Sequence, residues 1–568
     1  MAPALVGELA IRQLISASRL TNGTGSPFNL GGSPVDVANS PVSAGDSPTR
    51  LAISPIDVAV SPCAPGDFGG HKRALTTNFT VVKRSKPRQT VRIVQGVPSS
   101  DPPRPRADEL RDSFARIITG WAFGAMFFQL TSGPVYASFA RQLGMNETTF
   151  GFLAGVNMMF GFVQLVAARL LEGRVGAKPM MMWSGLLCRG LWVVAATLPI
   201  LHTFAPALVP RAAVVPLFVG CLLVSAVGQA FTGPPFFVWM SALVPTRVGS
   251  TFWAKRHQVG TLAGIVAVLA GGWLADQGAW AKAATHGHVT PLLLYSAILF
   301  VAAIFGVVDI AVFARVPQPA RDAAIGDKTP LWESFRAPLR ERPVRRYLAF
   351  TTLAYLGFAT TGPTTQLFCL ETLGLSRTQT GLLLSIGPLL GIALAAPMWG
   401  RIARSHGTRP MLRFCSVYMV LVPIAWLLCI RENLPAVAVL IFLSGALSAA
   451  YDISNLQFIT RSCPHLPRPI LTALFWLFQG VAFWLGSTLG GVVAQSFKGF
   501  HLSLFGMEFV NYHLVFAFSL VPRVLNAFWL APRLDEEGAT PTREALAQVG
   551  EGAAQTLGAR LRLGREGA

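Results

Sequence analysis

The sequence predicts an all-α membrane protein of twelve transmembrane helices, in two pseudo-symmetric six-helix halves preceded by a disordered N-terminal tail. Three observations predict this fold class: the composition, a series of uncharged stretches and an internal repeat. The 568 residues are 52% hydrophobic and only 13% charged, with a mean hydropathy of +0.49. An ordinary soluble domain has about 25% charged residues, so this composition indicates a chain that lies largely in a membrane.

Uncharged stretches long enough to cross a bilayer follow one another from residue 117 onward. Residues 117–140 and 148–168 hold no charge, and a membrane-spanning helix needs about 20 apolar residues. The same criterion gives twelve spans, at 117–140, 148–168, 180–201, 213–243, 258–275, 289–314, 347–370, 378–400, 410–430, 434–460, 469–496 and 510–531. The fourth span contains Pro234 and Pro235, which predict a kink.

The hydrophobic region repeats itself. Pro245 is followed twenty-six residues later by a Gly-Gly pair at 271–272, and Pro464 is followed at the same interval by a pair at 490–491. A second pattern precedes each copy, as Leu143-Gly144 in the first and Leu373-Gly374 in the second. The two patterns keep their order and are displaced by about 220 to 230 residues, which indicates two copies of one unit.

The net charge of +20 is distributed unevenly over the loops. Loops after spans 2, 4, 6, 8 and 10 hold twenty Lys and Arg residues, whereas the alternate loops hold six. Because positive residues stay on the cytoplasmic side, we expect both termini to be cytoplasmic. No basic and aromatic module accompanies the charge, so we expect no nucleic-acid partner.

The chain divides by composition into five parts. These are a Ser-, Pro- and Arg-rich tail (1–113), an N-terminal half (114–314), a basic linker (315–346), a C-terminal half (347–532) and a second tail (533–568). Ser-Pro recurs in the first tail every seven residues, from 26 to 61. This spacing fits either a tolerated spacer or a series of phosphorylation sites. We expect the C-terminal tail to be mobile rather than an interfacial helix.

Motifs that carry enzymatic chemistry are absent from the sequence. It contains no phosphate-binding Walker sequence, no HExxH and no GxSxG, so we predict that it is not an enzyme. The seven cysteines are scattered and form no CxxC, which argues against a zinc site and a disulfide framework. We therefore expect no metal and no cofactor.

Twelve spans in two copies of six, a long basic central loop and cytoplasmic ends resemble the major facilitator superfamily of secondary transporters. The resemblance covers residues 114–532. The family's loop motif runs Gly-x-Leu-Ala-Asp-Arg-x-Gly-Arg-Arg between the second and third helices of each half. The stretch from Gly400 to Arg409 matches both glycines, Ala403 and the final Arg, but Arg404 stands at the Asp position. In the first half, Gly176 and Lys178 match, and Gly173 replaces the Asp.

In the family, this loop latches neighbouring helix ends and controls switching between states. The resemblance therefore implies that glycines here form tight turns and that bases contact helix ends. The alternative is that the bases only fix the topology. The gating-loop candidates are Arg174, Gly176, Lys178, Gly400, Arg401, Gly407 and Arg409.

The resemblance also implies that helices one, four, seven and ten line a central cavity that holds the substrate. Polar and aromatic residues at these depths are the candidates for binding, because such side chains are costly in lipid unless they face water or a partner. Substrate and coupling candidates are Gln129, Tyr136, Gln229, Trp239, Tyr355, Gln366, Tyr451, Asp452 and Asn455. Thr residues of the seventh span can instead bond back to their own helix.

Asp452 is the only acidic residue well inside these four helices. It fits a proton or cation site, or a counter-charge for a cationic substrate, because an intramembrane carboxylate is functional by default. A structural pairing with Arg461 or Arg468 fits equally well. For three other intramembrane charges, we favour a structural ion pair or a side chain that reaches the interface: Arg189, Asp309 and Arg523.

The resemblance implies secondary active transport of a small molecule by alternating access, with the substrate, the direction and the coupling ion open. Alternatives are a transport-inactive scaffold or sensor that uses the long tail, and a lipid flippase. Membrane lipids and a proton or cation are the other expected partners. The expected location is the plasma or inner membrane, with an organelle membrane as the alternative.

Overall fold

The structure is a computed structural model of the whole chain. It describes residues 107–172, 176–318, 331–463, 466, 468–504, 506–536, 538–541, 543–544 and 547. The chain divides into units 1–96 and 97–568, and every described residue belongs to the second unit. The predicted tail with its Ser-Pro repeat lies outside the described residues up to residue 106. The first described helix begins at Ala107, inside the predicted tail.

The first half contains every predicted span in order. Its elements are α2 (Ala107–Ser132), α3 (Pro134–Gln142), α4 (Glu147–Met159), η1 (Phe160–Phe162), α5 (Val163–Glu172), α6 (Ala177–Phe204), α7 (Arg211–Leu243), α8 (Thr246–Asp276), α9 (Gly278–Ala284), α10 (Pro291–Val312) and η2 (Phe313–Arg315). Span four is one continuous helix, α7, with both prolines of the predicted kink inside it.

The second half follows the linker helix α11 (Leu331–Arg340). Its elements are α12 (Arg342–Leu367), η3 (Phe368–Thr372), α13 (Arg377–Gly381), η4 (Leu382–Ile386), α14 (Gly387–His406), α15 (Arg409–Leu427), α16 (Leu434–Ser462), α17 (Arg468–Ser496), α18 (Asn511–Leu525), η5 (Asn526–Leu530) and η6 (Ala531–Arg533). A hairpin of β1 (His501–Leu504) and β2 (Met507–Val510) precedes α18, with His501 opposite Val510.

Several spans are broken helices, for reasons present in the sequence. Gly133 and Pro134 separate α2 from α3, because proline has no N–H and cannot continue the hydrogen-bond ladder. A 3₁₀ turn around Gly161 separates α4 from α5. A π-helical turn leads into Gly387 and Pro388 in span eight. Within the described residues, nine helices are long and apolar enough to cross a membrane.

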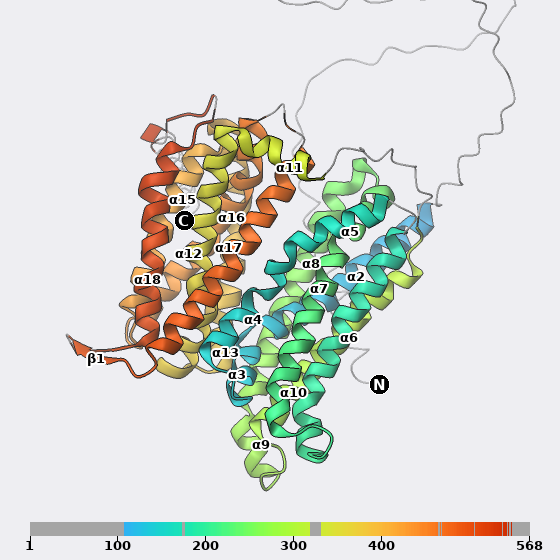
Figure 1. Cartoon of the computed structure of the whole chain (residues 1–568), viewed down its shortest axis with the longest axis vertical. Helices are drawn as coiled ribbons and strands as arrows, with labels where there is room; N and C mark the ends of the chain where they lie inside the picture. Colours follow the sequence, from blue (N-terminus) through green and yellow to red (C-terminus); the bar gives the residue numbers. More distant parts are fainter. Residues whose placement is uncertain are drawn as a thin grey trace, which may run out of the picture. The chain divides into compact units, whose positions relative to one another are not determined.

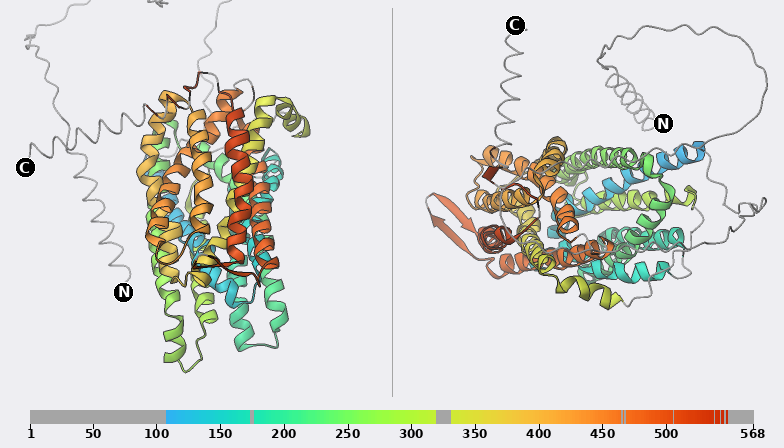
Figure 2. Two further views of the ribbon diagram at one scale, coloured as in Figure 1. Left: turned by 90° about the vertical axis from the view of Figure 1, so that its left-hand side faces the viewer. Right: turned by 90° about the horizontal axis from the view of Figure 1, so that it is seen from above.

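The two halves of unit 97–568 form two helical bundles side by side (Figure 1). In the left view of Figure 2 the long helices of both bundles run along a common direction, whereas Figure 1 and the right view show the two bundles inclined to each other. We call the end at which α3 and α13 meet the gate end, and the opposite end, which carries α11, the linker end. Helix α4 of the first half packs along α17 of the second, and α8 packs against α13.

The apolar core is shared at one end and divided at the other. One cluster contains Phe127 and Tyr136 of the first half together with Phe368 and Phe516 of the second. A separate cluster around Tyr347 contains residues of the second half alone, and another around Trp239 contains residues of the first half and its Val316. Among the described residues, the shared cluster is the buried apolar cluster that contains residues of both halves.

The repeated Gly-Gly pairs lie where the bundles touch. A methyl group on Gly272 of α8 would lie 3.0 Å from the Cα atom of Thr378 in the other half. A methyl group on Gly491 of α17 would lie 3.0 Å from the Cα atom of Thr148 in the other half. These close backbone approaches require glycine, which has no Cβ.

The first glycine of each pair faces its own half instead. Gly271 lies against Leu130 of α2, and Gly490 lies against the backbone of Thr360 in α12. The Gly-Gly pair thus fits one helix against two neighbours at once, one in each half. The two copies of the Gly-Gly pattern therefore make equivalent contacts between the halves.

Candidate functional site: a charged gate beside a central cavity

Arg141 and Glu371 join the halves at the gate end. Arg141, near the end of α3, donates from Nε to Glu371 Oε1 and from Nη2 to Glu371 Oε2, the second at 3.2 Å. Tyr512 of α18 also donates to Glu371 Oε2, at 2.6 Å. Burial lowers the pKa of Arg141 and the hydrogen bond to Glu371 raises it, with a net rise above its usual value. Arg141 therefore keeps its charge.

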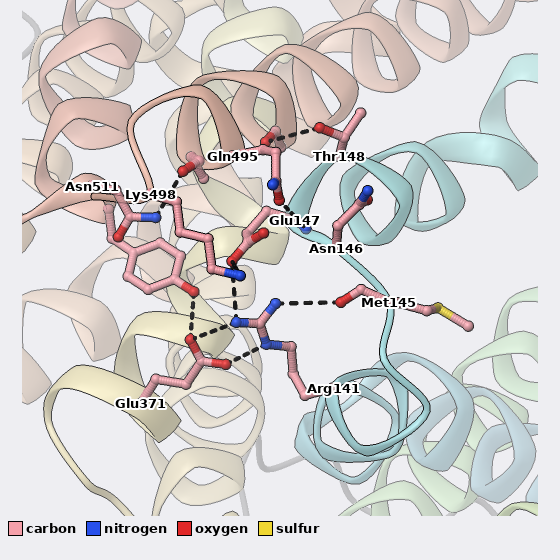
Figure 3. A network of polar contacts seen from close by, with 12 residues as sticks. Arg141, Met145, Asn146, Glu147, Thr148, Glu371, Gln495, Lys498 and Asn511 are labelled. Carbon is pink, nitrogen blue, oxygen red and sulfur yellow. Dashed lines mark hydrogen bonds and ion pairs between the residues drawn. The ribbon is translucent and has the colours of Figure 1, made fainter. Parts of the chain in front are cut away.

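Glu147 extends this network (Figure 3). It begins α4, is 1% exposed, and its Oε1 lies 3.1 Å from Arg141 Nη2 and 3.8 Å from Lys498 Nζ. Its backbone N–H donates to the Gln495 side chain of the other half at 3.3 Å. One arginine thus compensates two carboxylates, and one of these is almost fully buried.

A second polar contact joins α8 to the start of α13. Asp276 ends α8, and its carboxylate accepts from the backbone N–H groups of Arg377 and Thr378 at 2.8 and 3.1 Å, and from the Thr378 hydroxyl at 2.7 Å. Arg377 also forms an ion pair with it at 3.7 Å. The carboxylate of one half therefore caps a helix N-terminus of the other.

The gate charges occupy equivalent places in the two repeats. Arg141 and Glu371 are 230 residues apart, the same displacement as between Gly144 and Gly374. Both glycines have positive φ, of 89° and 60°, which accounts for the repeated Leu-Gly. Glu147 is displaced by 230 residues from Arg377. The signs are therefore inverted between the halves, with Arg then Glu in one and Glu then Arg in the other.

A cavity of about 300 Å³ lies between the halves beside this network. Its polar lining residues come from both halves: Thr131, Ser132, Asn157 and Gln366. Its aromatic lining residues also come from both halves: Tyr136, Phe150, Trp192 and Phe483. Gln366 donates from Nε2 to the carbonyl oxygen of Ser132 across the interface, at 3.1 Å. The cavity is placed where movement of one half against the other would change it.

Two of the predicted binding residues, Tyr136 and Gln366, line this cavity. Three others lie elsewhere in the first half. Gln129 lies against Gly264 of α8, and Gln229 accepts from Arg189 Nη1 at 3.2 Å. Trp239 is buried towards the linker end, where its Nε1 donates to the Pro317 carbonyl oxygen at 3.0 Å.

The remaining predicted residues form a cluster on α12 and α16. The Tyr355 and Tyr451 rings lie 6.0 Å apart, and Tyr347 donates to the carbonyl oxygen of Asn455 at 2.5 Å. Asp452 is exposed in α16 and lies within electrostatic range of Tyr355 and Tyr451. The side chains of Arg461 and Arg468, its alternative structural partners, lie outside the described residues.

Three intramembrane charges have structural partners. Arg189 Nη2 lies 3.8 Å from Asp309 Oδ2, and its guanidinium stacks 4.2 Å from the Phe127 ring centre. Arg523 donates to the carbonyl oxygens of Gly357 and Met419, at 3.1 and 2.8 Å. The contact of Arg189 with Asp309 is the predicted ion pair, whereas Arg523 is buried and bonds to carbonyl oxygens instead. Several Thr residues of α12 bond back to their own helix, among them Thr360 and Thr365.

The first gating loop contacts the end of span six. Lys178 donates from Nζ to the carbonyl oxygens of Ala314 and Val316, both at 2.8 Å. Gly176 is the N-cap of α6. A cation therefore satisfies carbonyl groups at a helix C-terminus. Arg174 lies outside the described residues.

The second gating loop receives a carboxylate from the C-terminal segment. Gly407 has φ +83°, and Glu536 Oε2 accepts from the backbone N–H groups of Thr408 and Arg409 at 2.8 and 2.7 Å. Arg409 Nη2 also lies 3.4 Å from Asp535. Gly400 and the exposed Arg401 lie on α14, and a methyl group on Gly400 would meet nothing within 4 Å in the described part of the chain.

This docking corrects the expectation of a C-terminal tail that is simply mobile. Glu536 supplies the N-terminal cap of α15, and Thr540 N donates to the His406 carbonyl oxygen at 3.1 Å. A lone Glu beyond the last span carries no sequence signal for such a contact. The gate carboxylates at 147, 276 and 371 were also missed, although the repeat displacement relates positions 141 and 371.

The fold and the site together define a multi-pass integral membrane protein of two repeated bundles with a cavity between them. The family model of the Major Facilitator Superfamily matches residues 347–562. The predicted resemblance is confirmed: the second half carries this family's sequence pattern, and the described region has the fold of its transporters.

Solved structures with this fold are transporters rather than enzymes. A mutant of the nucleoside transporter NupG has a TM-score of 0.55 at 13% identity over 75% of this chain and 100% of its own. An occupied, inward-facing bacterial homologue of the human lysosomal transporter Spinster has 0.58 at 12% over 76% and 98%. An inward-facing bacterial homologue of the iron transporter ferroportin has 0.56 at 13% over 75% and 98%. No curated protein matches the sequence.

Proposed function

We propose that this protein is a secondary active transporter that moves a small molecule by alternating access of the central cavity to the two sides of the membrane. The observation that carries the proposal is the asymmetry of the interface. The hydrogen bonds and ion pairs described above that join the halves lie at the gate end or beside the cavity, as in Arg141 with Glu371 and Asp276 with Thr378. The apolar cores towards the linker end are separate.

Such an interface has two arrangements available to it. Opening the gate end costs the ion pairs and the shared apolar contacts, and closing the linker end would create new ones between the separate bundles. The loop charges assign the linker end to the cytoplasm, so the present arrangement is closed to the outside. A solute in the cavity would then exchange with the cytoplasm.

The coupling site in this proposal is Asp452. It is an exposed carboxylate in a membrane-spanning helix, beside Tyr355 and Tyr451. An intramembrane carboxylate that reaches water binds a proton or a cation as the crevice opens and closes. Its binding energy would differ between the two arrangements, and that difference couples ion movement to the solute.

The test is flux in proteoliposomes containing the full-length protein, with and without a pH or cation gradient. We expect gradient-dependent uptake or release of at least one uncharged metabolite from a broad panel. A thermal-unfolding measurement first establishes that the protein is folded. Absence of flux for every solute by that folded protein would contradict the proposal and favour a scaffold or sensor.

A further inference from the structure

The chemistry of the cavity walls defines what the cavity can hold. We propose that it binds an uncharged solute of one or two rings that carries hydrogen-bond donors at its edge. This inference rests on the proposed function, because it names the substrate class of the same site. It is argued from the wall residues alone, in terms of charge, ring faces, hydrogen-bonding atoms and size.

The walls carry no compensating charge. None of the residues that line the cavity in the described part of the chain is Asp, Glu, Lys or Arg. The nearby gate charges Arg141, Glu147 and Glu371 are paired with one another. A charged solute would therefore lose its hydration without gaining a counter-ion, which is strongly unfavourable in a low-dielectric site.

Aromatic rings form one side of the cavity. The Tyr136 ring stacks on Phe150 with centres 5.7 Å apart and meets Trp192 edge-on at 5.9 Å. Phe483 of α17 contributes a ring from the other half. Ring faces of this kind attract flat heteroaromatic solutes and the C–H faces of saturated rings. A solute held between these walls contacts both halves.

Some polar atoms of the walls can only accept a further hydrogen bond, whereas Asn157 offers both donors and an acceptor. Gln366 Nε2 is already bonded to Ser132, whereas its Oε1 is buried without a hydrogen-bond partner among the described residues. Thr131 and Ser132 donate their hydroxyl hydrogens to carbonyl oxygens of their own helix, at 2.8 and 2.6 Å. Their oxygens can therefore only accept a further bond. A solute that supplies N–H or O–H donors can bond to the hydroxyl oxygen of Ser132, which is exposed in the wall.

The volume limits the size of the solute. A cavity of about 300 Å³ lies at the small end of the range for ligand sites, which is roughly 300–1,000 Å³. It suits a monosaccharide or a nucleobase-sized molecule better than a peptide or a lipid. The exposed polar side chains of Ser132 and Asn157 also disfavour an acyl chain, which would leave them without hydrogen-bond partners.

Charge-matched solute sets test this inference on the detergent-purified full-length protein. One set is glucose, glucosamine and glucuronate, and the other is uracil, 5-(aminomethyl)uracil and orotate. Binding is measured by thermal stabilisation and by calorimetry at millimolar solute. We expect the neutral members of one set to bind at least about tenfold more tightly than its charged members. The set that binds distinguishes a saturated ring from a heteroaromatic one.

Two substitutions locate the binding. Asn157 is exposed in the cavity wall, so Asn157→Asp adds a charge without changing the shape of the side chain. It should weaken binding of the neutral solute and strengthen binding of its cationic analogue, each by about tenfold. Ser132→Ala removes an exposed accepting oxygen of the wall and should weaken neutral binding by about tenfold. Gln318→Glu adds the same charge on the exposed surface and serves as the matched control.

The outcomes separate this inference from the proposed function. Tighter binding of a charged solute, or no binding by either set, overturns the inference about the solute class. The transporter proposal would still stand in that case if the protein moved another solute across the membrane. Neutral binding that Asn157→Asp and Ser132→Ala do not change would place the site elsewhere and also overturn it. Neutral binding with no flux in liposomes would contradict the transporter proposal instead.

Discussion

Arg141 and Glu371 occupy equivalent positions in the two repeats, 230 residues apart, and bind each other across the interface between the halves. Equivalent residues face each other near a pseudo-twofold axis, so identical charges there would repel. The two copies have opposite charges at this position and again at Glu147 and Arg377. Divergence of the two copies has thus converted a symmetric position into an ion pair.

The pair should bias the equilibrium between the two arrangements. Arg141→Ala and Glu371→Gln should each increase opening at the gate end. The double variant should open little more than the single variant with the larger effect, because both substitutions remove the same Arg141–Glu371 interaction. Both side chains are partly exposed, so the coupling should be ~0.2–1 kcal/mol. Opening is measured as the rate at which a thiol reagent added on the outside labels a cysteine substituted for Asn157. Strict additivity of the two changes would contradict a direct interaction.

Arg141 should matter more for stability than Glu371. Arg141→Met removes the partner of Glu147, which is 1% exposed, and leaves a buried carboxylate with only Lys498 nearby. We expect a loss of roughly 3 kcal/mol for Arg141→Met and about 1 kcal/mol for Glu371→Gln. Thermal unfolding of the two variants compares them. The additional change Glu147→Gln should restore much of the loss, and failure to do so would contradict the assignment.

Sequence predicted the number and order of the spans because membrane crossing imposes a length and polarity that are visible locally. It also placed Gly271, Gly272, Gly490 and Gly491 in a repeat, but their neighbours required the structure. Contacts such as Arg141 with Glu371 join residues far apart in the chain, and periodicity contains no information about partners. Glu536 lay in a segment with no motif, so its role as a cap was not predictable.

The glycine pairs provide a matched test of the interface. Gly491→Ala and Gly272→Ala place a methyl group against the other half, so they should push the bundles apart and increase access to the cavity from outside. Gly490→Ala crowds only its own half at Thr360 and should lower stability without that increase in access. Cysteine accessibility and thermal unfolding separate the two effects. Equal accessibility in all three variants would contradict the proposed contact.

Gly400→Ala is the neutral control for these variants. It lies within α14, and among the described residues a methyl group there meets nothing within 4 Å. Alanine is the better helix former, so stability should be unchanged or rise by up to about 1 kcal/mol. A destabilised Gly400→Ala protein would mean that the glycine comparison does not isolate interface contacts.

Glu536 should stabilise the second half through the N-terminus of α15. Glu536→Gln weakens charge-assisted bonds to Thr408 and Arg409, with an expected loss of about 1–2 kcal/mol. Asp535→Asn is the control, because the Asp535 side chain is 75% exposed and should contribute little. The unfolding midpoints of the two full-length variants compare the stability lost at each position. An equal effect of both would contradict the capping role.

Asp452 should carry the coupling rather than the solute. Asp452→Asn cannot bind a proton or cation, so it should abolish accumulation driven by an ion gradient and leave solute exchange without a gradient. Counterflow and gradient-driven uptake in the same liposomes measure the two activities. Gradient-driven uptake that survives this substitution would place the coupling group elsewhere.

Alternating access is tested most directly by paired distances across the two ends of the molecule. In a cysteine-free background, spin labels at the exposed positions Gln142 and Thr372 span the gate end, and labels at Ser241 and Ser405 span the linker end. The account predicts that solute or an ion gradient lengthens the first distance while it shortens the second. Distances that stay fixed at both ends, or change in the same direction, would contradict it.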